Sequence, residues 1–346
     1  MEALTEAGHE VRGLDSLSPA VHNGKPSYIP NEADLRVADV RDPAAVEDAL
    51  EGMDAVCHLA AMVGLGVSLA DLPLYSDVNV TGTAVLLEAM GRRVVPRLVL
   101  SSSMVVYGEG AYDCALDGGV RPLPREAADL DAGVFEPRCP RCGSALHWST
   151  VGEDAVLDPR SAYATSKVAQ EYLAANWARL TGGTAVALRY HNVYGPRMPR
   201  DTPYSGVAAI FRSCLENGMP PRVFEDGGQR RDFVHVRDVA RCNVLALEAA
   251  GATNQAVTSA GTLRAYNVAS GTPHTVLEMA SALAAEFGGQ IEPKVTGEYR
   301  LGDVRHVVAA PVAARRDLGF TATIGFGEGM AEFACAPLRA PAAASH

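Results

Sequence analysis

An alternation of short apolar segments with helical segments constrains the fold of this chain more than any other feature. Strands are expected at residues 10–14, 35–37, 55–58, 97–100 and 184–188, and helices at 1–7, 43–50, 78–90 and 162–180. Strands that are separated by helices pair in parallel, because each connection must cross the sheet and the crossover helices cover its faces. The sequence therefore predicts an α/β fold with a doubly wound parallel sheet.

The composition is that of a globular protein and excludes several classes of partner. Of 346 residues, 48% are hydrophobic and 21% are charged, and the formal net charge is −11. No basic stripe interrupts this acidic balance, so we expect neither nucleic acid nor an anionic membrane surface as a partner. No apolar run approaches the ~18 residues of a membrane span. Seven scattered cysteines, an odd number, favour a reducing, cytoplasmic location.

The string Tyr163-Ala-Thr-Ser-Lys167 carries the clearest chemical signal. Tyr and Lys four residues apart lie on the same face of a helix, one turn from each other. A nearby ammonium favours the phenolate, so we expect Lys167 to lower the pKa of Tyr163 from its usual value near ~10. Tyr163 would then accept a proton from a sugar or alcohol hydroxyl at neutral pH. Because Tyr and Lys are common on helix surfaces, the pair alone is weak evidence.

Two further strings stand in order around this pair. Upstream, the strand at 97–100 ends in Ser101-Ser-Ser103, and downstream comes Arg189-Tyr-His-Asn-Val-Tyr-Gly-Pro196. This ordered set resembles the extended short-chain dehydrogenase/reductase family, and within it the NAD-dependent nucleotide-sugar epimerases and dehydratases. The resemblance runs from about residue 1 to about residue 330. It implies a Rossmann-like sheet, NAD as cofactor, a nucleotide-sugar substrate and a homodimer.

A second, smaller lobe is expected after the sheet, because the later chain is looser and richer in Gly and Pro. The expected division is a NAD-binding Rossmann domain at 1–192 and 231–270, with a cysteine-rich insert at about 109–158, a C-terminal substrate-binding lobe at 193–230 and 271–335, and an Ala/Pro-rich, frayed tail at 336–346.

One element of such a sheet does not occur in this sequence. A dinucleotide-binding sheet normally opens with a strand and a Gly-rich turn, GxxGxxG in the family, that places the pyrophosphate at a helix N-terminus. Here the first residues already read as the helix that follows that turn. A wrongly chosen start codon or a truncation would explain this. The first strand and the Gly-rich loop are accordingly expected to be missing from the fold.

The residues expected to hold the cofactor follow the strands of the sheet. Asp15 ends the strand at 10–14, where a carboxylate accepts hydrogen bonds from the adenine-ribose hydroxyls and repels a 2′-phosphate, which favours NAD over NADP; alternatively, Asp15 only begins a turn. By resemblance, Asp39 would bond the adenine amino group and Asn79 would support the active site from the neighbouring helix. Lys167 would also bond the nicotinamide ribose. The other residues expected at the cofactor are Val40, Leu59, Ala60, Ala61, Ser101, Tyr163, Tyr190, Asn192 and Val193.

The resemblance assigns the catalytic groups to Ser103, Tyr163 and Lys167. Ser103 would bond the C4 oxygen of the sugar as it becomes a ketone; the alternative is an ordinary helix cap. Related dehydratases carry Thr-Asp-Glu at this point, whereas this chain has Ser103-Met104-Val105, and neither Met nor Val can transfer a proton. We therefore expect NAD-dependent 4-epimerisation through a 4-keto intermediate rather than 4,6-dehydration.

Three residues resemble the family's grip on the substrate diphosphate. Asn192, Arg231 and Arg300 match an Asn and two Arg that hold it, and Ser103 would complete the substrate contacts. Planar guanidinium groups suit bidentate binding of phosphate oxygens. The alternative is that both arginines form ordinary surface ion pairs.

The insert contains Cys114 and the string Cys139-Pro-Arg-Cys142-Gly143. A C-P-x-C-G string has the shape of a zinc knuckle, in which two thiolates leave one tight turn. A complete site needs four ligands, so an expected structural zinc has Cys114 as third ligand and Asp117 or His147 as the fourth, unless the cysteines are inert thiols. A similar cysteine-rich segment in bacterial dTDP-L-rhamnose 4-epimerases points to a deoxysugar on a thymidine carrier as substrate.

Other functions stay open at this stage. A nucleotide-sugar 4-ketoreductase or decarboxylase would use the same Ser103, Tyr163 and Lys167. The absent Gly-rich loop leaves a non-catalytic nucleotide-binding protein as a further alternative.

The expected homodimer would use two long helices per subunit, here those at 78–90 and 162–180. The second of them carries more apolar surface than one helix flank beside a sheet requires. This surface either binds the partner subunit or fills the subunit's own core, and its residues are Tyr172, Leu173, Trp177 and Leu180.

Overall fold

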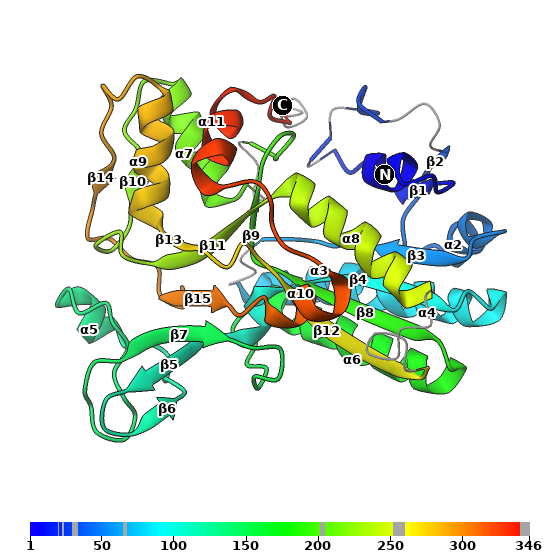
Figure 1. The fold of residues 1–346 in the computed structure, drawn as a ribbon, viewed down its shortest axis with the longest axis horizontal. Helices are drawn as coiled ribbons and strands as arrows, with labels where there is room; N and C mark the ends of the chain where they lie inside the picture. Colours follow the sequence, from blue (N-terminus) through cyan, green and yellow to red (C-terminus); the bar gives the residue numbers. More distant parts are fainter. Residues whose placement is uncertain are drawn as a thin grey trace.

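The structure places two larger β-sheets side by side, with two small two-stranded sheets beside them, and packs helices around them (Figure 1). It is a computed structural model that describes residues 1–19, 21–22, 24–29, 34–64, 68–200, 205–251 and 260–339. Within these ranges no helix combines the length and apolarity needed to cross a lipid bilayer.

The central sheet is parallel, as the alternation of strands and helices predicted. Its strands lie in the order β3, β4, β8, β12, with every neighbouring pair parallel. Their bounds are β3 Ala55–His58, β4 Arg97–Ser103, β8 Thr184–Tyr190 and β12 Thr262–Val268. The carboxyl ends of β4 and β8 meet at Ser103 and Tyr190, which pair with each other. This edge is therefore where a doubly wound sheet binds its ligands.

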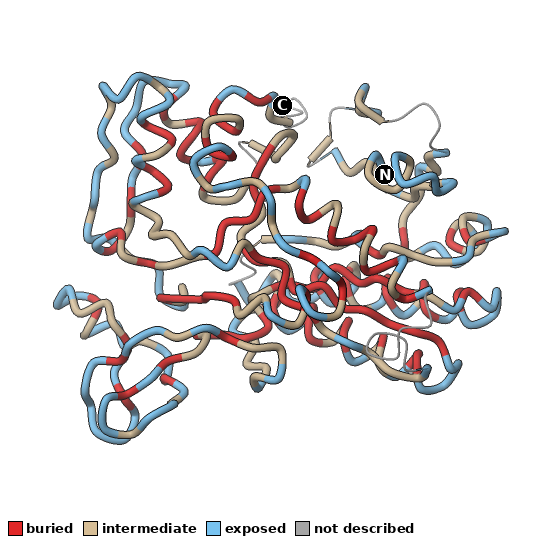
Figure 2. The backbone as a smooth tube through the Cα atoms, in the orientation of Figure 1, coloured by how far each residue is buried: buried red, intermediate tan, exposed pale blue. Residues whose placement is uncertain are grey.

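Helices cover both faces of this sheet because successive strand residues point to opposite sides. Val99 packs on one face with α8 (Val236–Gly251) and α10 (Val312–Leu318). Leu98 and Leu100 pack on the other face, where the covering helices are α2 Pro43–Leu50, α4 Gly82–Arg93 and α6 Ala162–Thr181. The buried residues gather at these two layers (Figure 2). The predicted α/β fold with helices on both faces is confirmed.

The first two strands form a separate sheet. β1 (Arg12–Asp15) pairs in parallel with β2 (Asp34–Val37), after the short helix α1 (Glu2–Glu6). In the described part of the chain, β1 has no other partner strand and β3 pairs only with β4. Among the described residues no strand pairs with both β1 and β3, so these parallel strands belong to two separate sheets.

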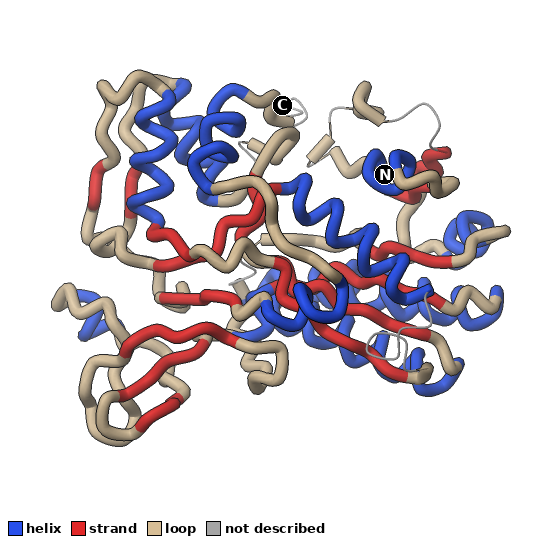
Figure 3. Tube along the Cα trace, in the orientation of Figure 1, coloured by secondary structure: helices blue, strands red, loops and turns tan. Residues whose placement is uncertain are grey.

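The second sheet is mixed and joins segments that are far apart in the sequence. Figure 3 shows the strands of the sheets in red. Its strand order is β13, β11, β15, β7, β5, β6, and β9 pairs with β11 in addition. The bounds are β5 Ala111–Cys114, β6 Gly118–Val120, β7 His147–Val151, β9 Asn192–Tyr194, β11 Arg230–His235, β13 Pro273–Thr275 and β15 His306–Ala309. The insert thus extends the sheet of the substrate lobe, and its strands β5 and β6 project from the body of the molecule (Figure 1).

This arrangement differs from the expected division of the chain at α10, which falls in 271–335 but packs on the central sheet, and at β11. Residues 231–270 were assigned to the Rossmann domain, but β11 belongs to the mixed sheet, where it pairs with β13 and β15. Only the following helix α8 and strand β12 pack on the central sheet. The sequence pattern cannot separate the two cases, since a buried strand reads alike in either sheet.

The remaining elements build the core of the substrate lobe or lie in short loops. Phe211, Met279 and Phe333 meet in this core from three different helices. The helices are α7 Val207–Glu216, α9 Val276–Glu286 and α11 Phe326–Cys335, the paired short strands are β10 Arg222–Val223 and β14 Lys294–Val295, and the short helices are α3 Leu72–Tyr75 and α5 Ala127–Asp131. Of the tail expected to fray, Arg339 forms a bridge with Pro199 and 340–346 lie outside the described residues.

Candidate active site

Helix α6 brings Tyr163 and Lys167 to the carboxyl end of β4. The helix begins after Ser161, whose hydroxyl accepts a hydrogen bond from the Ala164 amide and caps the first turn. Lys167 is only 2% exposed, and its Nζ donates a 2.8 Å hydrogen bond to the carbonyl of Ser101. The same Nζ lies 5.9 Å from the centre of the Tyr163 ring. The predicted i, i+4 pair therefore faces the end of the central sheet.

The pKa of Tyr163 is shifted in the opposite direction from the one expected. Burial raises the pKa of Tyr163 to about 12, and the neighbouring Tyr75 adds to the rise, while a hydrogen bond with Ser103 lowers it. Burial also lowers the pKa of Lys167 to about 7, against the negative charge of Glu171, which raises it. The expected lowering of the Tyr163 pKa by Lys167 does not occur in this structure, because desolvation disfavours both charged forms at once.

Ser103 forms the cap that the sequence left open as one of its two roles, and it also contacts Tyr163. It is the last residue of β4, and its hydroxyl caps a short 3₁₀ turn at 104–107 by accepting a 3.4 Å hydrogen bond from the Val105 amide. It is also hydrogen-bonded to the hydroxyl of Tyr163. The cap bond is long, so the hydroxyl is free to turn towards a bound oxygen atom.

Asn79 lies in a wide helical turn and links the loop after β3 to helix α6. Residues Ser76–Thr81 form a π-helix ahead of α4, so the helix expected at 78–90 begins with a bulge rather than with regular α-helix. The buried Asn79 amide donates to the Met62 carbonyl at 3.0 Å and to the Ser166 hydroxyl at 2.8 Å. Such bulges often occur at functional sites because they redirect one side chain. Here Asn79 fixes the loop after β3 to the helix turn that carries Tyr163.

A buried ion pair between α6 and β8, which the sequence analysis missed, lies next to the site. Glu171 follows Lys167 by four residues on α6, and the Arg189 guanidinium binds both of its oxygens, at 3.0 and 2.8 Å. Their side chains are only 4% and 5% exposed. The Ser102 hydroxyl donates a further 2.5 Å hydrogen bond to Glu171. The i, i+4, i+8 spacing of Tyr163, Lys167 and Glu171 was a signal that could have identified this residue.

A large cavity of about 1080 Å³ opens at Tyr163, between the central sheet and the substrate lobe. Tyr163, Met104 and Val105 line it from the sheet side. Asn192, Arg231 and Arg300, which the resemblance assigned to the substrate, line the same cavity. The Asn192 side-chain oxygen is buried without a hydrogen-bond partner in the described structure.

Arg231 forms no ion pair among the described residues of this cavity. Its guanidinium donates to three backbone carbonyls, those of Arg230, Val304 and Arg305, at 2.7–2.8 Å. Among the described residues no carboxylate forms an ion pair with it. Burial lowers the pKa of Arg231, yet an arginine stays charged in proteins. A half-buried guanidinium that hydrogen-bonds to carbonyls and forms no ion pair can still bind an anion. Arg300 is exposed, and its guanidinium lies 5.1 Å from the centre of the Phe224 ring.

The expected cofactor residues line the carboxyl ends of β1, β2 and β3 and the neighbouring turns. The exposed Asp15 accepts a 2.8 Å hydrogen bond from the Leu17 amide and thus also begins a turn. Asp39 is engaged by the Arg41 side chain, which lowers the pKa of that carboxyl. Val40 is buried against Gly82, and the exposed Leu59 precedes Ala60 and Ala61 after β3.

Two expected cofactor residues of the later chain are turned away from that edge. The Tyr190 hydroxyl donates to Asn243 on α8 at 2.8 Å. Val193 pairs with Val234 in the mixed sheet and packs on the core cluster under α8.

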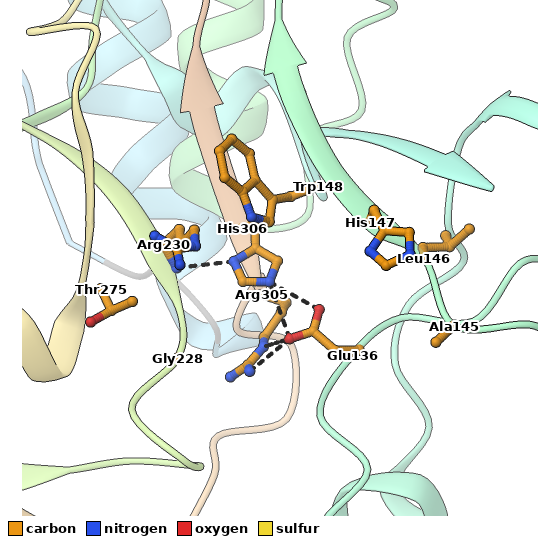
Figure 4. A pocket seen from close by; sticks show the side chains of 10 residues that line it. All are labelled: Glu136, Ala145, Leu146, His147, Trp148, Gly228, Arg230, Thr275, Arg305 and His306. Atoms are coloured by element: carbon orange, nitrogen blue, oxygen red, sulfur yellow. Dashed lines mark hydrogen bonds and ion pairs between the residues drawn. The ribbon is translucent and has the colours of Figure 1, made fainter. Parts of the chain in front are cut away.

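A smaller cavity of about 380 Å³ lies apart from this chemistry, between the insert and the substrate lobe (Figure 4). Its lining contains none of the predicted catalytic or cofactor residues. Glu136 of the insert reaches across to β15, where it accepts hydrogen bonds from Arg305 at 2.8 Å and pairs with His306 at 2.9 Å. The His147 side chain also borders this cavity (Figure 4).

The cysteines of the insert gather at one point, with Asp117 beside them. The sulfur atoms of Cys114, Cys139 and Cys142 and a carboxylate oxygen of Asp117 all lie within 4.8 Å of one another. His147, the residue named as the alternative fourth ligand, is not in this group, so its assignment as a metal ligand is wrong. The reason is strand register: His147 begins β7 opposite Asp113, which places it on the cavity side of the insert.

Comparison with known proteins places these features in a family. The sequence profile of the NAD dependent epimerase/dehydratase family matches residues 1–123 and 145–269. The chain is 32% identical to a dTDP-L-rhamnose 4-epimerase of Burkholderia thailandensis over 326 residues, which cover 92% of this chain and 85% of that protein. It is 30% identical to the mouse UDP-glucose 4-epimerase over 331 residues, covering 91% and 83%.

Solved structures of epimerases are similar to the fold as well. A Thermus thermophilus UDP-glucose 4-epimerase in complex with NAD superimposes with a TM-score of 0.72 and 30% identity, covering 96% of this chain and 92% of that one. A Thermotoga maritima UDP-glucose 4-epimerase with UDP-glucose gives a TM-score of 0.75 and 26% identity, with the same coverage.

Proposed function

The chain belongs to the NAD-dependent epimerase/dehydratase family, and on that premise we propose that it inverts the configuration at C4 of a nucleotide-activated sugar. The observation that carries this proposal is the shared cavity. Tyr163 lines it from the sheet side, and the half-buried Arg231, which forms no ion pair among the described residues, lines it from the lobe. An acid–base group at one wall and a cation at another suit a substrate with a reacting hydroxyl and a charged diphosphate.

The residues at the nicotinamide and ribose ends fit NAD as a resident cofactor. A lysine ammonium offers three N–H donors, and the hydrogen bond to Ser101 uses one of them. The described residues supply no second acceptor for this buried group, so ribose hydroxyls would complete its hydrogen bonds. Asp15, at the end of β1, stands where a carboxylate receives the hydroxyls of the other ribose. When bound, NAD would supply the hydride chemistry that no side chain provides.

The side chains would then move protons and hold the sugar. Tyr163 would accept the C4 hydroxyl proton and return it later to the inverted centre. Ser103, hydrogen-bonded to the same phenol, would donate to the C4 oxygen while it is a carbonyl. Because burial raises the Tyr163 pKa to about 12, a positive charge nearby is needed to stabilise the phenolate, and Lys167 is the nearest basic side chain on its helix.

The wall beside Ser103 argues against dehydration of the sugar. Met104 and Val105 line the cavity directly after the catalytic serine. Expulsion of water requires an acid and a base next to the sugar ring, and neither side chain can carry a proton. A single-carbon oxidation and reduction needs no such pair, which is why we propose epimerisation rather than 4,6-dehydration.

A thymidine-linked deoxysugar is the proposed substrate. The 32% identity to a dTDP-L-rhamnose 4-epimerase supports this choice, and so does the cysteine-rich insert named in the sequence analysis. The direct experiment incubates the purified protein with NAD⁺ and dTDP-L-rhamnose, with UDP-glucose in parallel, and follows the 4-epimers by NMR without added reductant. Formation of an epimer supports the proposal. Stoichiometric NADH consumption with a 4-keto sugar, and no epimer, would make the protein a reductase instead.

We expect Arg231→Ala to raise the KM for the nucleotide sugar by roughly 10- to 100-fold, the effect of losing a charged hydrogen bond of about 1.5–3 kcal/mol. The matched control is Arg230→Ala, because the Arg230 side chain lies over Trp148 in the smaller cavity. The carbonyl that Arg230 offers to Arg231 is kept in that variant. An unchanged KM for Arg231→Ala would remove this arginine from the substrate site.

A homodimer through α4 and α6 is also proposed. Tyr172 is 64% exposed and Leu180 78% exposed, which leaves apolar surface on α6 for a partner subunit. Trp177, by contrast, is buried among the subunit's own α2, α4 and α6 residues. The expected interface therefore rests on the first two residues and not on the tryptophan.

A further inference from the structure

The clustered sulfur and oxygen atoms of the insert come from two loops with the same sequence spacing. The segments Cys114-Ala-Leu-Asp117-Gly118 and Cys139-Pro-Arg-Cys142-Gly143 both place a second polar group three residues after a cysteine and a glycine directly behind it. Gly118 and Gly143 have φ of 69° and 74°, the left-handed conformation that such a turn requires. Asp117 thus occupies in the first loop the position that Cys142 occupies in the second.

The same hydrogen bond supports the first sulfur of each loop. The Leu116 amide donates to the Cys114 sulfur at 3.4 Å, and the Arg141 amide donates to the Cys139 sulfur at 3.5 Å. Amide donors of this kind stabilise negative charge on sulfur and orient it, as the outer shell of a metal site does. These two sulfur atoms, of Cys114 and Cys139, lie within 4.8 Å of each other.

Three distances among the four atoms are close to the edges of a tetrahedron around one metal ion. With zinc–sulfur bonds of ~2.3 Å and zinc–oxygen bonds of ~2.0–2.2 Å, the edges of such a tetrahedron measure about 3.5–3.8 Å. Cys114 sulfur lies 3.5 Å from that of Cys142 and 3.6 Å from the Asp117 carboxylate, and Cys139 sulfur lies 3.2 Å from that carboxylate. A disulfide is excluded at this distance, since its sulfurs would be ~2.05 Å apart.

The insert has little else to hold it together. Its own core consists of Tyr112, Cys114, Cys139 and Leu146, with Val120 packed against them. Residues 124–144, which include the second loop, fall between the two parts matched by the family profile. An added segment of this size cannot offset its ordering entropy with so few buried apolar groups.

We propose that Cys114, Asp117, Cys139 and Cys142 bind one Zn²⁺ as a structural staple of the insert. Three thiolates select a soft divalent ion, and the carboxylate completes a closed four-coordinate site without a place for a reacting water. The staple joins the β5–β6 turn to the arm that begins at Glu136. Through the bonds of Glu136 to Arg305 and His306, it fixes the insert to β15 of the substrate lobe.

Metal analysis of the intact protein, purified without chelator, tests the site. We expect about one zinc per chain in the wild type, and loss of that zinc in the double variant Cys139→Ser/Cys142→Ser. The Asp117→Ala variant should release zinc to a weak chelator faster than the wild type, whereas His147→Ala should match the wild type. A wild-type zinc content below about 0.2 per chain, an iron-only content, or equal release from Asp117→Ala would overturn the assignment.

Two measurements on the wild type keep the test independent of variant folding and of enzyme activity. Replacement of zinc by Co²⁺ should produce the thiolate charge-transfer and visible bands of a tetrahedral cobalt–sulfur site. Removal of the metal should make residues 109–158 sensitive to limited proteolysis while the rest of the chain resists. An octahedral cobalt spectrum would refute the ligand set, and unchanged resistance of the insert would refute its role as a staple.

Discussion

Tyr163→Phe is expected to lower kcat by roughly 10²–10⁴, the usual contribution of a positioned acid–base group. The substitution removes one oxygen and leaves the ring against Tyr75, whose centroid lies 6.0 Å away. Met104 and Val105, which line the same side of the cavity, cannot carry a proton in its place. Steady-state epimerisation of the proposed substrate measures the effect.

The control for this variant lies on the same helix. Tyr172→Phe removes the same atom from a side chain that is 64% exposed and does not line the cavity. It should keep the wild-type kcat. Both variants should unfold at the wild-type temperature, because neither loses a buried hydrogen bond to a charged group. Wild-type turnover of Tyr163→Phe would end the assignment of Tyr163 as the acid–base group.

Glu171→Gln is expected to lower the free energy of unfolding by about 3–5 kcal/mol, the cost of removing one partner from a buried ion pair. Arg189 would keep its charge with the neutral amide, the Tyr107 hydroxyl and the Glu153 carbonyl as its partners. The substitution should also affect the active site, because Glu171 accepts a hydrogen bond from Ser102, the residue before Ser103 on β4. Denaturant titration followed by circular dichroism measures it.

An exposed pair in the same protein provides the matched control. Glu88→Gln removes the i, i+4 partner of Arg92, whose side chain is half exposed, and should cost no more than about 0.5 kcal/mol. The double variant Glu171→Leu/Arg189→Met should be more stable than Glu171→Gln, because it leaves no buried charge. A cost of Glu171→Gln equal to that of Glu88→Gln would show that the buried pair does not stabilise the fold.

Features that depend on a few neighbouring residues were readable from the sequence. Helix α2 and strand β3 have the predicted bounds, because Asp42 caps the first and a short apolar run forms the second. The i, i+4 spacing put Tyr163 and Lys167 on one helix face, and the serines that end β4 lie beside them. Helix caps, periodicity and spacing act over one or two turns of chain, so the local sequence contains them.

Features that depend on burial and on distant partners required the folded chain. Lys167 does not lower the Tyr163 pKa here, because the enclosure of both groups outweighs their mutual charge. Strand register excludes His147 from the cysteine cluster and admits Asp117. The pairing of Glu171 with Arg189, and of the insert with β15, joins segments whose sequences contain no sign of each other. Desolvation and long-range pairing are set by which elements pack together, and that is a property of the assembled sheets rather than of any local pattern.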